Sequence, residues 1–201
     1  VRADADGYTV LDTDEEPVAV DVETVSFTAE ETGKSGYDHY MLKEIHEQPT
    51  ALRQCFSGRG DALDGTITLE EIDDIPQPDA VQFVACGTSY HAGLYAKELI
   101  ETYTDLRVSV DIASEYRRTE GTVPEETLVV AITQSGETAD TLAALREAGR
   151  AGVRTLALTN TLGSTVTREA DETVFIRAGP EIGVAATKTF VSQVATATLL
   201  T

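Results

Sequence analysis

The chain has 201 residues, with 35 Asp and Glu against 15 Lys and Arg, so its formal net charge is −20. This charge argues against nucleic acid and against anionic membrane surfaces as partners. The length fits one domain with an appendage, and no apolar run approaches the roughly 20 residues of a membrane helix. The acidic residues are scattered and only four of the basic residues are lysines, a composition that a halophilic, high-salt cytoplasm favours.

The cysteine content indicates the cellular compartment, and the two chain ends indicate how much of the protein the sequence covers. Cys55 and Cys86 are too few for a disulfide framework or a cysteine metal site, so we expect a reducing, cytoplasmic location and no metal. We also expect no signal peptide. The chain begins at Val1, and residues 193–201 are apolar and helix-like without a cap. We therefore expect a piece of a longer protein.

Residues 1–36 are polar and acidic and predict a β-hairpin followed by a linker from residue 30. Residues 8–11 and 18–22 are strand-like, residues 25–27 could extend the second strand, and residues 12–17 are rich in turn formers. Such a hairpin has too little apolar surface to be stable alone. We expect it to belong to a domain whose other part is missing.

Residues 37–76 predict a helical linker. Its main element is a helix over residues 37–56, and Pro49 inside it predicts either two helices or a kink. A loop follows over residues 57–65, residues 66–72 are ambiguous, and prolines at 76 and 78 mark the entry to the main domain. The apolar positions of the helix are Met41, Ile45, Leu52 and Phe56.

From residue 77 to residue 201 strands alternate with helices. The expected strands are residues 81–85, 108–112, 128–132, 155–159 and 173–176, and the expected helices are 90–103, 142 to about 151, 165–170 and 187 onward. A short helical or irregular piece starts at residue 115. This order predicts an α/β fold with a doubly wound, five-stranded parallel sheet. Ligands of such sheets bind at the carboxyl ends of the strands, which gathers residues 86–89, 133–138 and 159–164, with loop 183–187 within reach.

Two of these turns have the same chemistry. Residues 86–89 contain a glycine and two hydroxyls, and residues 133–138 contain a glycine and three hydroxyls. Neither has the lysine of a Walker loop or a G-x-G-x-x-G pattern, so a nucleotide is a weak hypothesis. We expect such a turn to leave backbone N–H groups unpaired at the helix start. Together with the hydroxyls, these N–H groups suit a phosphate or a sugar. The alternative is that these hydroxyls only cap the helix. We expect both roles, with Ser135 and Thr138 capping the helix when the site is empty and binding phosphate when it is occupied.

Four further residues have both a functional and a structural interpretation. Cys86 follows a strand and could be a nucleophile, but free cysteine is usually just buried. His91 could face the site or lie on the helix surface. Glu137 could be a general base, or it could only favour the helix dipole. Lys188 could pair with a phosphate or lie on a solvated helix.

Four motifs in order carry a family resemblance: ACGTSYHAG at residues 85–93, SEYR at 114–117, QSGETADT at 134–141 and EIGVAATK at 181–188. Together they resemble the first sugar-isomerase (SIS) domain of the isomerizing glutamine–fructose-6-phosphate aminotransferase family. YDHYMLKEIHEQP at residues 37–49 resembles the linker of that family. The resemblance covers about residues 37–201, and the hairpin before it matches the expected end of the glutaminase domain.

The resemblance implies an enzyme that makes glucosamine 6-phosphate and glutamate from fructose 6-phosphate and glutamine. It implies no cofactor, a homodimer, and two further parts, a glutaminase domain and a second SIS domain. The catalytic residues belong to those parts, so none is expected here and the fragment alone is expected to be inactive. By motif, Cys86, Gly87, Thr88 and Ser89 would line the sugar-phosphate site, Thr133, Gln134, Ser135 and Thr138 would hold the phosphate, and Val184 and Ala186 would contact the sugar end.

Three positions depart from the family pattern. Thr133 and Ala186 stand where serine is usual or common, and His91 stands where asparagine is frequent. The departures put the sugar contacts in doubt and leave the phosphate site intact. Two rival functions remain. The first is a non-catalytic SIS module that senses sugar phosphates, although no basic DNA-reading helix is visible. The second is a stand-alone phosphosugar isomerase, although the chain lacks an evident base.

Overall fold

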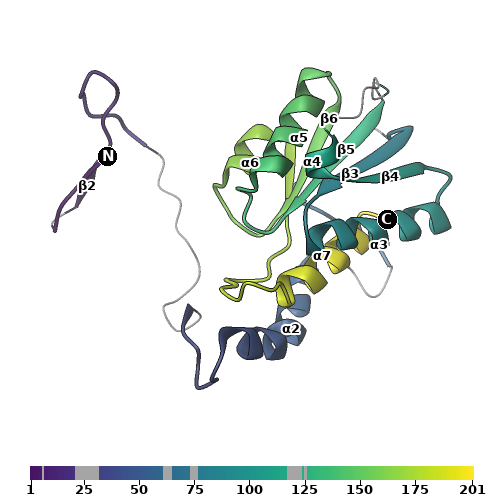
Figure 1. Ribbon diagram of the computed structural model, residues 1–201, viewed down its shortest axis with the longest axis horizontal. Coiled ribbons are helices and arrows are strands. Elements are labelled where there is room, and N and C mark those ends of the chain that lie inside the picture. The colour runs from purple at the N-terminus through teal and green to yellow at the C-terminus, as the bar shows by residue number, and fades with distance from the viewer. Residues whose placement is uncertain (6, 21–31, 61–64, 73–76, 117–123, 125) are drawn as a thin grey trace.

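A computed structural model describes residues 1–5, 7–20, 32–60, 65–72, 77–116, 124 and 126–201. Its main body is a parallel sheet of five strands in the order β4-β3-β5-β6-β7 (Figure 1). The strands are β3 (Ala80–Ala85), β4 (Arg107–Ile112), β5 (Thr127–Thr133), β6 (Arg154–Thr159) and β7 (Glu172–Phe175). The predicted doubly wound, five-stranded parallel sheet is confirmed, and each predicted strand agrees with the structure to within a residue at either end.

The middle strand β5 is buried along its whole length. It pairs with β3 on one side and β6 on the other, and Val130 lies opposite Phe83 and Leu156. A strand covered on both faces favours a continuous run of β-branched and aliphatic residues, and residues 128–132 are such a run. The unbroken apolar stretch in the sequence therefore marks the centre of the sheet.

Helices cover both faces of the sheet (Figure 1). On one face α3 (Thr88–Tyr103) and α7 (Lys188–Leu199) pack against Phe83 and Val130. On the other face α4 (Ala113–Tyr116), α5 (Ala139–Arg150) and α6 (Thr165–Glu169) pack against Val84 and Val129. Neighbouring residues of one strand thus serve opposite cores, as the pleat of a strand requires.

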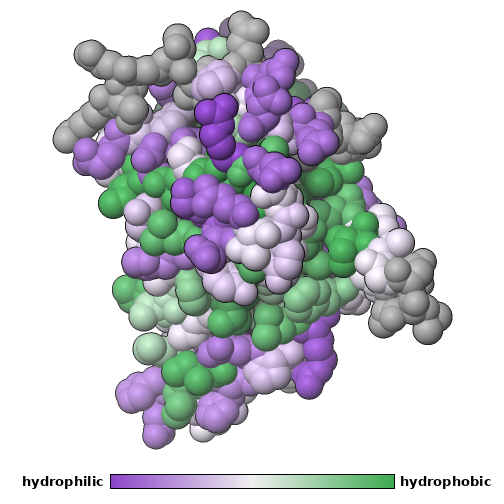
Figure 2. Space-filling model, turned by 90° about the vertical axis from the view of Figure 1, so that its right-hand side faces the viewer, coloured by the Kyte–Doolittle hydropathy of each residue, from purple (hydrophilic) through white to green (hydrophobic). Residues whose placement is uncertain are grey.

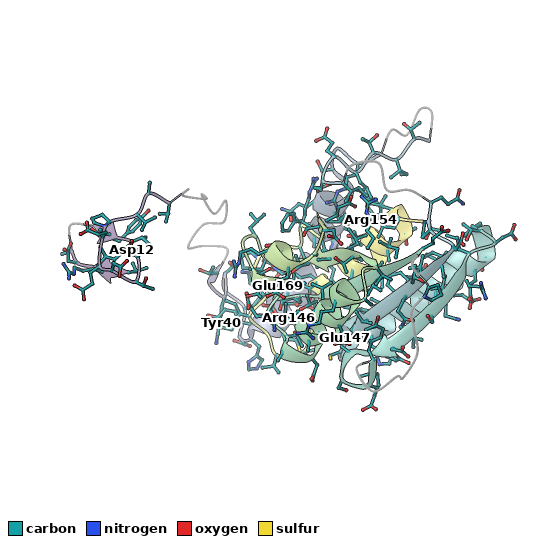
Figure 3. All side chains as sticks on the ribbon, turned by 90° about the horizontal axis from the view of Figure 1, so that it is seen from above. Asp12, Tyr40, Arg146, Glu147, Arg154 and Glu169 are labelled. Carbon is teal, nitrogen blue, oxygen red and sulfur yellow. The ribbon has the colours of Figure 1, made fainter. Side chains whose placement is uncertain are left out.

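The surface carries ion pairs between elements as well as scattered charge. Arg146 of α5 and Glu169 of α6 point toward one another (Figure 3), with Nε and Nη2 of Arg146 at 2.7 and 2.6 Å from the two carboxylate oxygens. The hydrogen bond and charge of Glu169 raise the pKa of Arg146. Figure 2 shows one face, on which hydrophilic side chains lie between apolar patches. Within the described ranges, no helix has the length and apolar character needed to cross a membrane.

Helix α2 (Tyr40–Phe56) packs against α7. It runs through Pro49 as one helix, so the prediction of two separate helices is wrong. Proline removes one N–H from the helix ladder, and packing against α7 holds the helix together despite that loss. The helix buries Lys43, Glu44 and Cys55, whereas Met41 is exposed.

The segment after α2 is fastened to strand β7 by a buried arginine. Arg59 is 1% exposed, and it donates through Nη1 to the carbonyl of Cys55 at 3.2 Å and through Nη2 to the carbonyl of Phe175 at 2.6 Å. Its Nη2 also donates to Glu71, which Arg177 contacts as well. The ambiguous residues 66–72 form neither helix nor strand, apart from a bridge between Gly60 and Ile67.

Near the N-terminus, β1 (Arg2–Ala3) pairs antiparallel with β2 (Tyr8–Thr9). The prediction that residues 8–9 pair with the strand after the turn is therefore wrong. Residues 10–11 do meet residues 17–18, through a Leu11–Pro17 bridge and a bond of 2.9 Å from Val18 N–H to the Val10 carbonyl. Pro17 has no N–H to extend a ladder. Residues 21–27 lie outside the described residues.

The predicted turn over residues 12–17 is organised by one side chain. Asp12 (Figure 3) accepts the N–H groups of Asp14 and Glu16 through Oδ1 at 2.8 and 3.0 Å. Aspartate commonly turns a chain in this way, by bonding the backbone a few residues ahead. The turn residues were thus predicted correctly, whereas the predicted pairing of residues 8–9 with the strand after the turn was not.

Candidate functional site

The candidate site lies at the point where the strand order reverses. β3 and β5 are neighbours in the sheet, but β3 leads into α3 on one face and β5 leads into α5 on the other. The two connections diverge there and leave a crevice at the carboxyl ends of the strands. A cavity of about 190 Å³ lies in this place, lined by Cys86, Thr88, Ser89, Ile132, Thr133, Gln134, Ser135, Thr138, Thr141, Glu181, Gly183, Val184 and Ala186.

Nine of the ten residues predicted for the site line this one cavity, and Gly87 is outside the lining. Gly87 is the N-cap of α3, with φ 58° and ψ −134°, a conformation that suits glycine. Four lining residues carried no predicted role: Ile132, Thr141, Glu181 and Gly183. Glu181 and Gly183 belong to the EIGVAATK motif, and Thr141 belongs to the QSGETADT motif. Membership of these motifs could have identified the three residues as part of the site.

The turn between β3 and α3 brings two hydroxyls to the start of a helix. Thr88 and Ser89 form the first turn of α3, which begins two residues earlier than predicted. Ser89 is buried, and its Oγ accepts a hydrogen bond of 3.0 Å from Nε2 of Gln193 on α7. Because a hydroxyl both accepts and donates, Ser89 can still donate its proton to a ligand. Cys86 accepts a weak contact of 4.0 Å from the Thr141 hydroxyl.

The turn between β5 and α5 is closed by its own hydroxyls. Thr133 Oγ1 accepts the N–H of Gly136 and Ser135 Oγ accepts the N–H of Glu137, both at 3.2 Å. The hydroxyls of Thr133 and Thr138 are also 3.2 Å apart. The expectation of unpaired N–H groups in this turn is therefore wrong for residues 136 and 137. Thr138 occupies the N-cap of α5, but its hydroxyl makes no cap bond there, so the predicted cap is also wrong.

The segment between β6 and α6 and the start of α6 donate hydrogen bonds to the backbone carbonyls of the same turn. The carbonyl of Gln134 accepts the N–H of Asn160 at 3.1 Å, and the carbonyl of Gly136 accepts the N–H of Val166 at 3.0 Å. Gly136 has φ 70°, and a Cβ at this position would overlap the Cβ and Oγ of Ser164. Only glycine therefore fits between the turn and Ser164.

Glu137 serves the neighbouring helix rather than the cavity. Its Oε1 accepts the N–H of Thr165, at the start of α6, at 2.7 Å. The hydrogen bonds from Thr165 lower the pKa of the Glu137 carboxyl, and the charge of Arg168 adds to the effect. A lowered pKa makes a carboxylate a weaker base, and Glu137 is outside the cavity lining. The interpretation of Glu137 as a general base is therefore not supported by its position.

Two other candidates lie away from the cavity. His91 is exposed, and its ring is 5.7 Å from the ring of Tyr90. Lys188 is only 4% exposed, and its Nζ is 2.6 Å from Oε2 of Glu47 on α2. The interpretation of Lys188 as a residue of a solvated helix face is wrong, because its side chain is buried. A buried ammonium requires a charged partner, and Glu47 provides it.

The loop over residues 181–187 forms the remaining wall. The carboxylate of Glu181 accepts the N–H groups of Thr187 and Thr189 at 2.9 and 3.4 Å and the hydroxyls of both residues. These donors lie at the positive N-terminal end of α7, where a carboxylate is stabilised. Val184, in the middle of the loop, is fully exposed. The loop is thus anchored at its end and presents small side chains to the cavity.

The lining is polar and contains little charge. Six residues with hydroxyl groups and Gln134 line the cavity, and the described lining residues include no lysine or arginine. The carboxylate of Glu181 is engaged by four donors. Hydroxyl and backbone donors of this kind suit phosphate and sugar oxygens.

Comparison with known proteins agrees with this chemistry. The chain is 67% identical over 92% of its length to glutamine–fructose-6-phosphate aminotransferase [isomerizing] of Halobacterium salinarum, covering 31% of that protein. It is 50% identical over 97% of its length to the enzyme of the same name from Symbiobacterium thermophilum, covering 33%. The chain therefore spans about a third of the length of these curated relatives.

A solved structure and a family model complete the comparison. The C-terminal domain of glucosamine-fructose-6-phosphate aminotransferase from Francisella tularensis superimposes with a TM-score of 0.78 at 41% identity, covering 84% of this chain and 48% of that one. The SIS domain model matches residues 74–201. This match includes all five strands of the parallel sheet and the whole cavity lining. The chain belongs to the SIS domain family.

Proposed function

We propose that this chain is the sugar-phosphate-binding part of an isomerizing glutamine–fructose-6-phosphate aminotransferase. The enzyme would convert fructose 6-phosphate and glutamine to glucosamine 6-phosphate and glutamate. The observation that carries the proposal is the single cavity that joins two hydroxyl-rich turns at the reversal of the strand order. Residues 1–36 would end the glutaminase domain, residues 37–76 would be the linker, and residues 77–201 would be the first SIS domain.

The geometry favours the turn over residues 133–138 as the phosphate end of the site. Thr133, Ser135 and Thr138 of this turn line the cavity, and their hydroxyls can donate to phosphate oxygens. Glu181, which also lines the cavity, would repel a phosphate at short range. The sugar end of the ligand would therefore lie toward Val184 and Ala186.

The cavity accounts for only part of a binding site. Its volume of about 190 Å³ is below the roughly 300–1,000 Å³ of most small-molecule sites. The missing walls and the groups that move protons would come from the rest of the enzyme. A second SIS domain, a glutaminase domain and a homodimeric partner are the parts that the proposal requires. In this proposal the chain binds substrate without itself supplying a catalytic residue.

Substituting Thr138 with valine is expected to weaken fructose 6-phosphate binding about tenfold, because one hydroxyl donor to a charged phosphate is lost. Valine keeps the shape of threonine. The change removes no cap bond, although it does remove the 3.2 Å contact with the Thr133 hydroxyl. Isothermal titration calorimetry with the 201-residue chain measures the dissociation constant.

The matched control is Thr102→Val. Thr102 is exposed on α3, and its hydroxyl donates to the Glu98 carbonyl of the same helix, so sugar-phosphate affinity should stay at the wild-type value. Hydrogen exchange tests the binding role directly. If neither fructose 6-phosphate nor glucosamine 6-phosphate protected the amides of residues 133–138, the proposed function would be wrong.

A further inference from the structure

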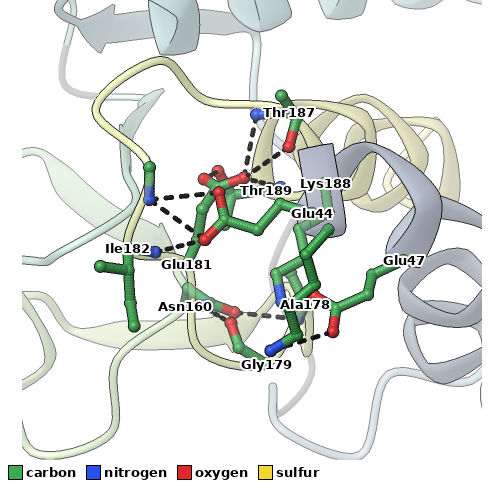
Figure 4. Close-up of polar contacts among 12 residues, drawn as sticks. Glu44, Glu47, Asn160, Ala178, Gly179, Glu181, Ile182, Thr187, Lys188 and Thr189 are labelled. Atoms are coloured by element: carbon green, nitrogen blue, oxygen red, sulfur yellow. Dashed lines mark hydrogen bonds and ion pairs between the residues drawn. The ribbon is translucent and has the colours of Figure 1, made fainter. Parts of the chain in front are cut away.

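Helix α2 reaches the wall of the cavity through one buried carboxylate (Figure 4). Glu44 is 2% exposed, and its Oε1 accepts the N–H of Ile182 at 2.6 Å. The N–H of Gly183 is 3.1 Å from each carboxylate oxygen. These contacts join residues 138 and 139 positions apart in the chain. A residue of the helix before the sheet thereby holds a loop that lines the cavity.

Backbone donors make this buried carboxylate tenable. A carboxylate taken out of water is destabilised by several kcal/mol unless hydrogen bonds replace the lost hydration. The N–H groups of Ile182 and Gly183 provide such bonds, and hydrogen bonds to a charged group are stronger than those between neutral groups. The bonds from Ile182 and Gly183 to Glu44 anchor the start of the loop. The bond from the N–H of Thr187 to Glu181 anchors its end. Residues 183–186 are held between these two anchors.

A second contact on the same side of α2 keeps Glu44 in register with the loop. One turn further along the helix, Oε2 of Glu47 is 2.6 Å from Nζ of Lys188, the first residue of α7 (Figure 4). Lys43 also pairs with Glu47 at 3.3 Å. The loop leads directly into α7, so the Glu47–Lys188 pair fixes the helix that ends the loop relative to the helix that carries Glu44.

The loop approaches α2 so closely that a side chain at position 183 would displace the carboxylate. A Cβ on Gly183 would overlap Oε2 of Glu44, whereas the backbone Cα of Met41 would stay at an ordinary 3.5 Å. The lack of a side chain at Gly183 therefore allows both the carboxylate contact and the loop position. Alanine here would push Glu44 off its two donors.

We propose that Glu44 is a positioning residue, which acts through the N–H groups of Ile182 and Gly183 to set the cavity wall from helix α2. This inference rests on the proposed function, because the position of the cavity wall is measured through the affinity for a sugar phosphate. It also means that a displacement of α2 would be transmitted to residues 183–186. The linker helix is then a physical connection between the sugar cavity and whatever part of the enzyme precedes it.

The test is a double-mutant cycle with Glu44→Ala and Gly183→Ala in the 201-residue chain. Each single change should weaken fructose 6-phosphate binding on the order of tenfold, since each removes hydrogen bonds to a charged group. With the carboxylate gone, Gly183→Ala meets no obstacle from Glu44, so the double variant should bind about as well as Glu44→Ala alone. Strong non-additivity of this kind is the sign of a direct contact.

Two controls separate positioning from general loss of structure. Glu98→Ala removes a carboxylate from an exposed position on α3 and should leave affinity unchanged. Ala51→Gly loosens the packing of α2 against Ile176 and Ala178, so it should lower the melting temperature with little change in affinity. A merely structural Glu44 would instead lower affinity only in proportion to the loss of stability.

Amide hydrogen exchange measured without ligand tests the contact of Glu44 with the loop independently of sugar binding. In Glu44→Ala, the amides of Ile182 and Gly183 should exchange at least tenfold faster than in the wild type, while the amides of β5 should not change. If those two amides exchange at the wild-type rate, or if the two substitutions weaken binding additively, the inference is overturned. If the wild-type chain binds no sugar phosphate although the exchange result holds, the proposed function fails and the Glu44 anchor stands.

Discussion

Gly136→Ala is expected to lower the free energy of unfolding by about 3 kcal/mol, through a strained backbone and an overpacked contact acting together. Gly136 has φ 70°, where an L-residue is disfavoured. The added Cβ would overlap Ser164 and lie 3.1 Å from Cγ1 of Val166. Neither side can easily move, since Gly136 bonds Thr133 through its N–H and Val166 through its carbonyl. Urea unfolding followed by circular dichroism measures the loss.

The chain offers a glycine of the opposite character as a control. Gly149 lies in α5, has an ordinary φ, and a Cβ there would meet no atom within 4 Å. Because alanine is the better helix former, Gly149→Ala should raise stability by about 0.5–1 kcal/mol. Opposite signs for the two changes would locate the effect at the turn. A wild-type midpoint for Gly136→Ala would show that the turn does not need glycine.

Much of the domain was predictable because its signals are local. The run over residues 128–132 is apolar without interruption, as a central parallel strand requires. The glycine-containing turns at residues 86–89 and 133–138 follow two of the predicted strands, so the sheet rule alone brought them to one edge. The predictions of free N–H groups and of a helix cap failed, because the sequence does not show which hydrogen-bond partner each hydroxyl of the turn contacts. Thr133 closes its own turn from the end of a strand, a contact that depends on the fold of the turn.

The contacts of α2 were beyond the reach of the sequence pattern. Hydrophobic periodicity assigns a helix its apolar face, yet α2 buries Lys43 and Glu44 and exposes Met41 and Phe56. The reason is that the partners of Glu44 are backbone N–H groups more than a hundred residues away. Backbone donors leave no trace in composition or spacing. Such a carboxylate becomes recognisable only when the tertiary structure places the donors beside it.

Arg59→Met is expected to lower the free energy of unfolding by about 3 kcal/mol, the size typical of breaking a buried, hydrogen-bonded ion pair. Methionine fills part of the space but donates nothing to the carbonyls of Cys55 and Phe175 or to Glu71. These bonds fasten the segment after α2 to strand β7, so the loss should appear in the global unfolding transition. Urea unfolding at pH 7 measures it.

The control is Arg150→Met on α5, which removes the same charge from a side chain that is 72% exposed and pairs with Glu147. Exposed pairs contribute little, so this change should stay below about 1 kcal/mol. Equal losses for the two variants would contradict a special role for the buried arginine.

The pH dependence of the same variant identifies the carboxylate involved. Burial raises the pKa of Glu71, but the hydrogen bond and charge of Arg59, together with a backbone hydrogen bond and the charge of Arg177, outweigh it and hold the pKa below the ordinary value of 4.5. A lowered folded-state pKa contributes stability that is present above pH 4.5 and is lost as the pH falls through the folded-state pKa. Without Arg59 burial is less opposed, so the variant should lose less stability than the wild type between roughly pH 5 and pH 3. The gap between the two unfolding curves should therefore narrow as the solution is acidified, whereas a constant gap would mean that Arg59 acts through the two carbonyls and not through Glu71.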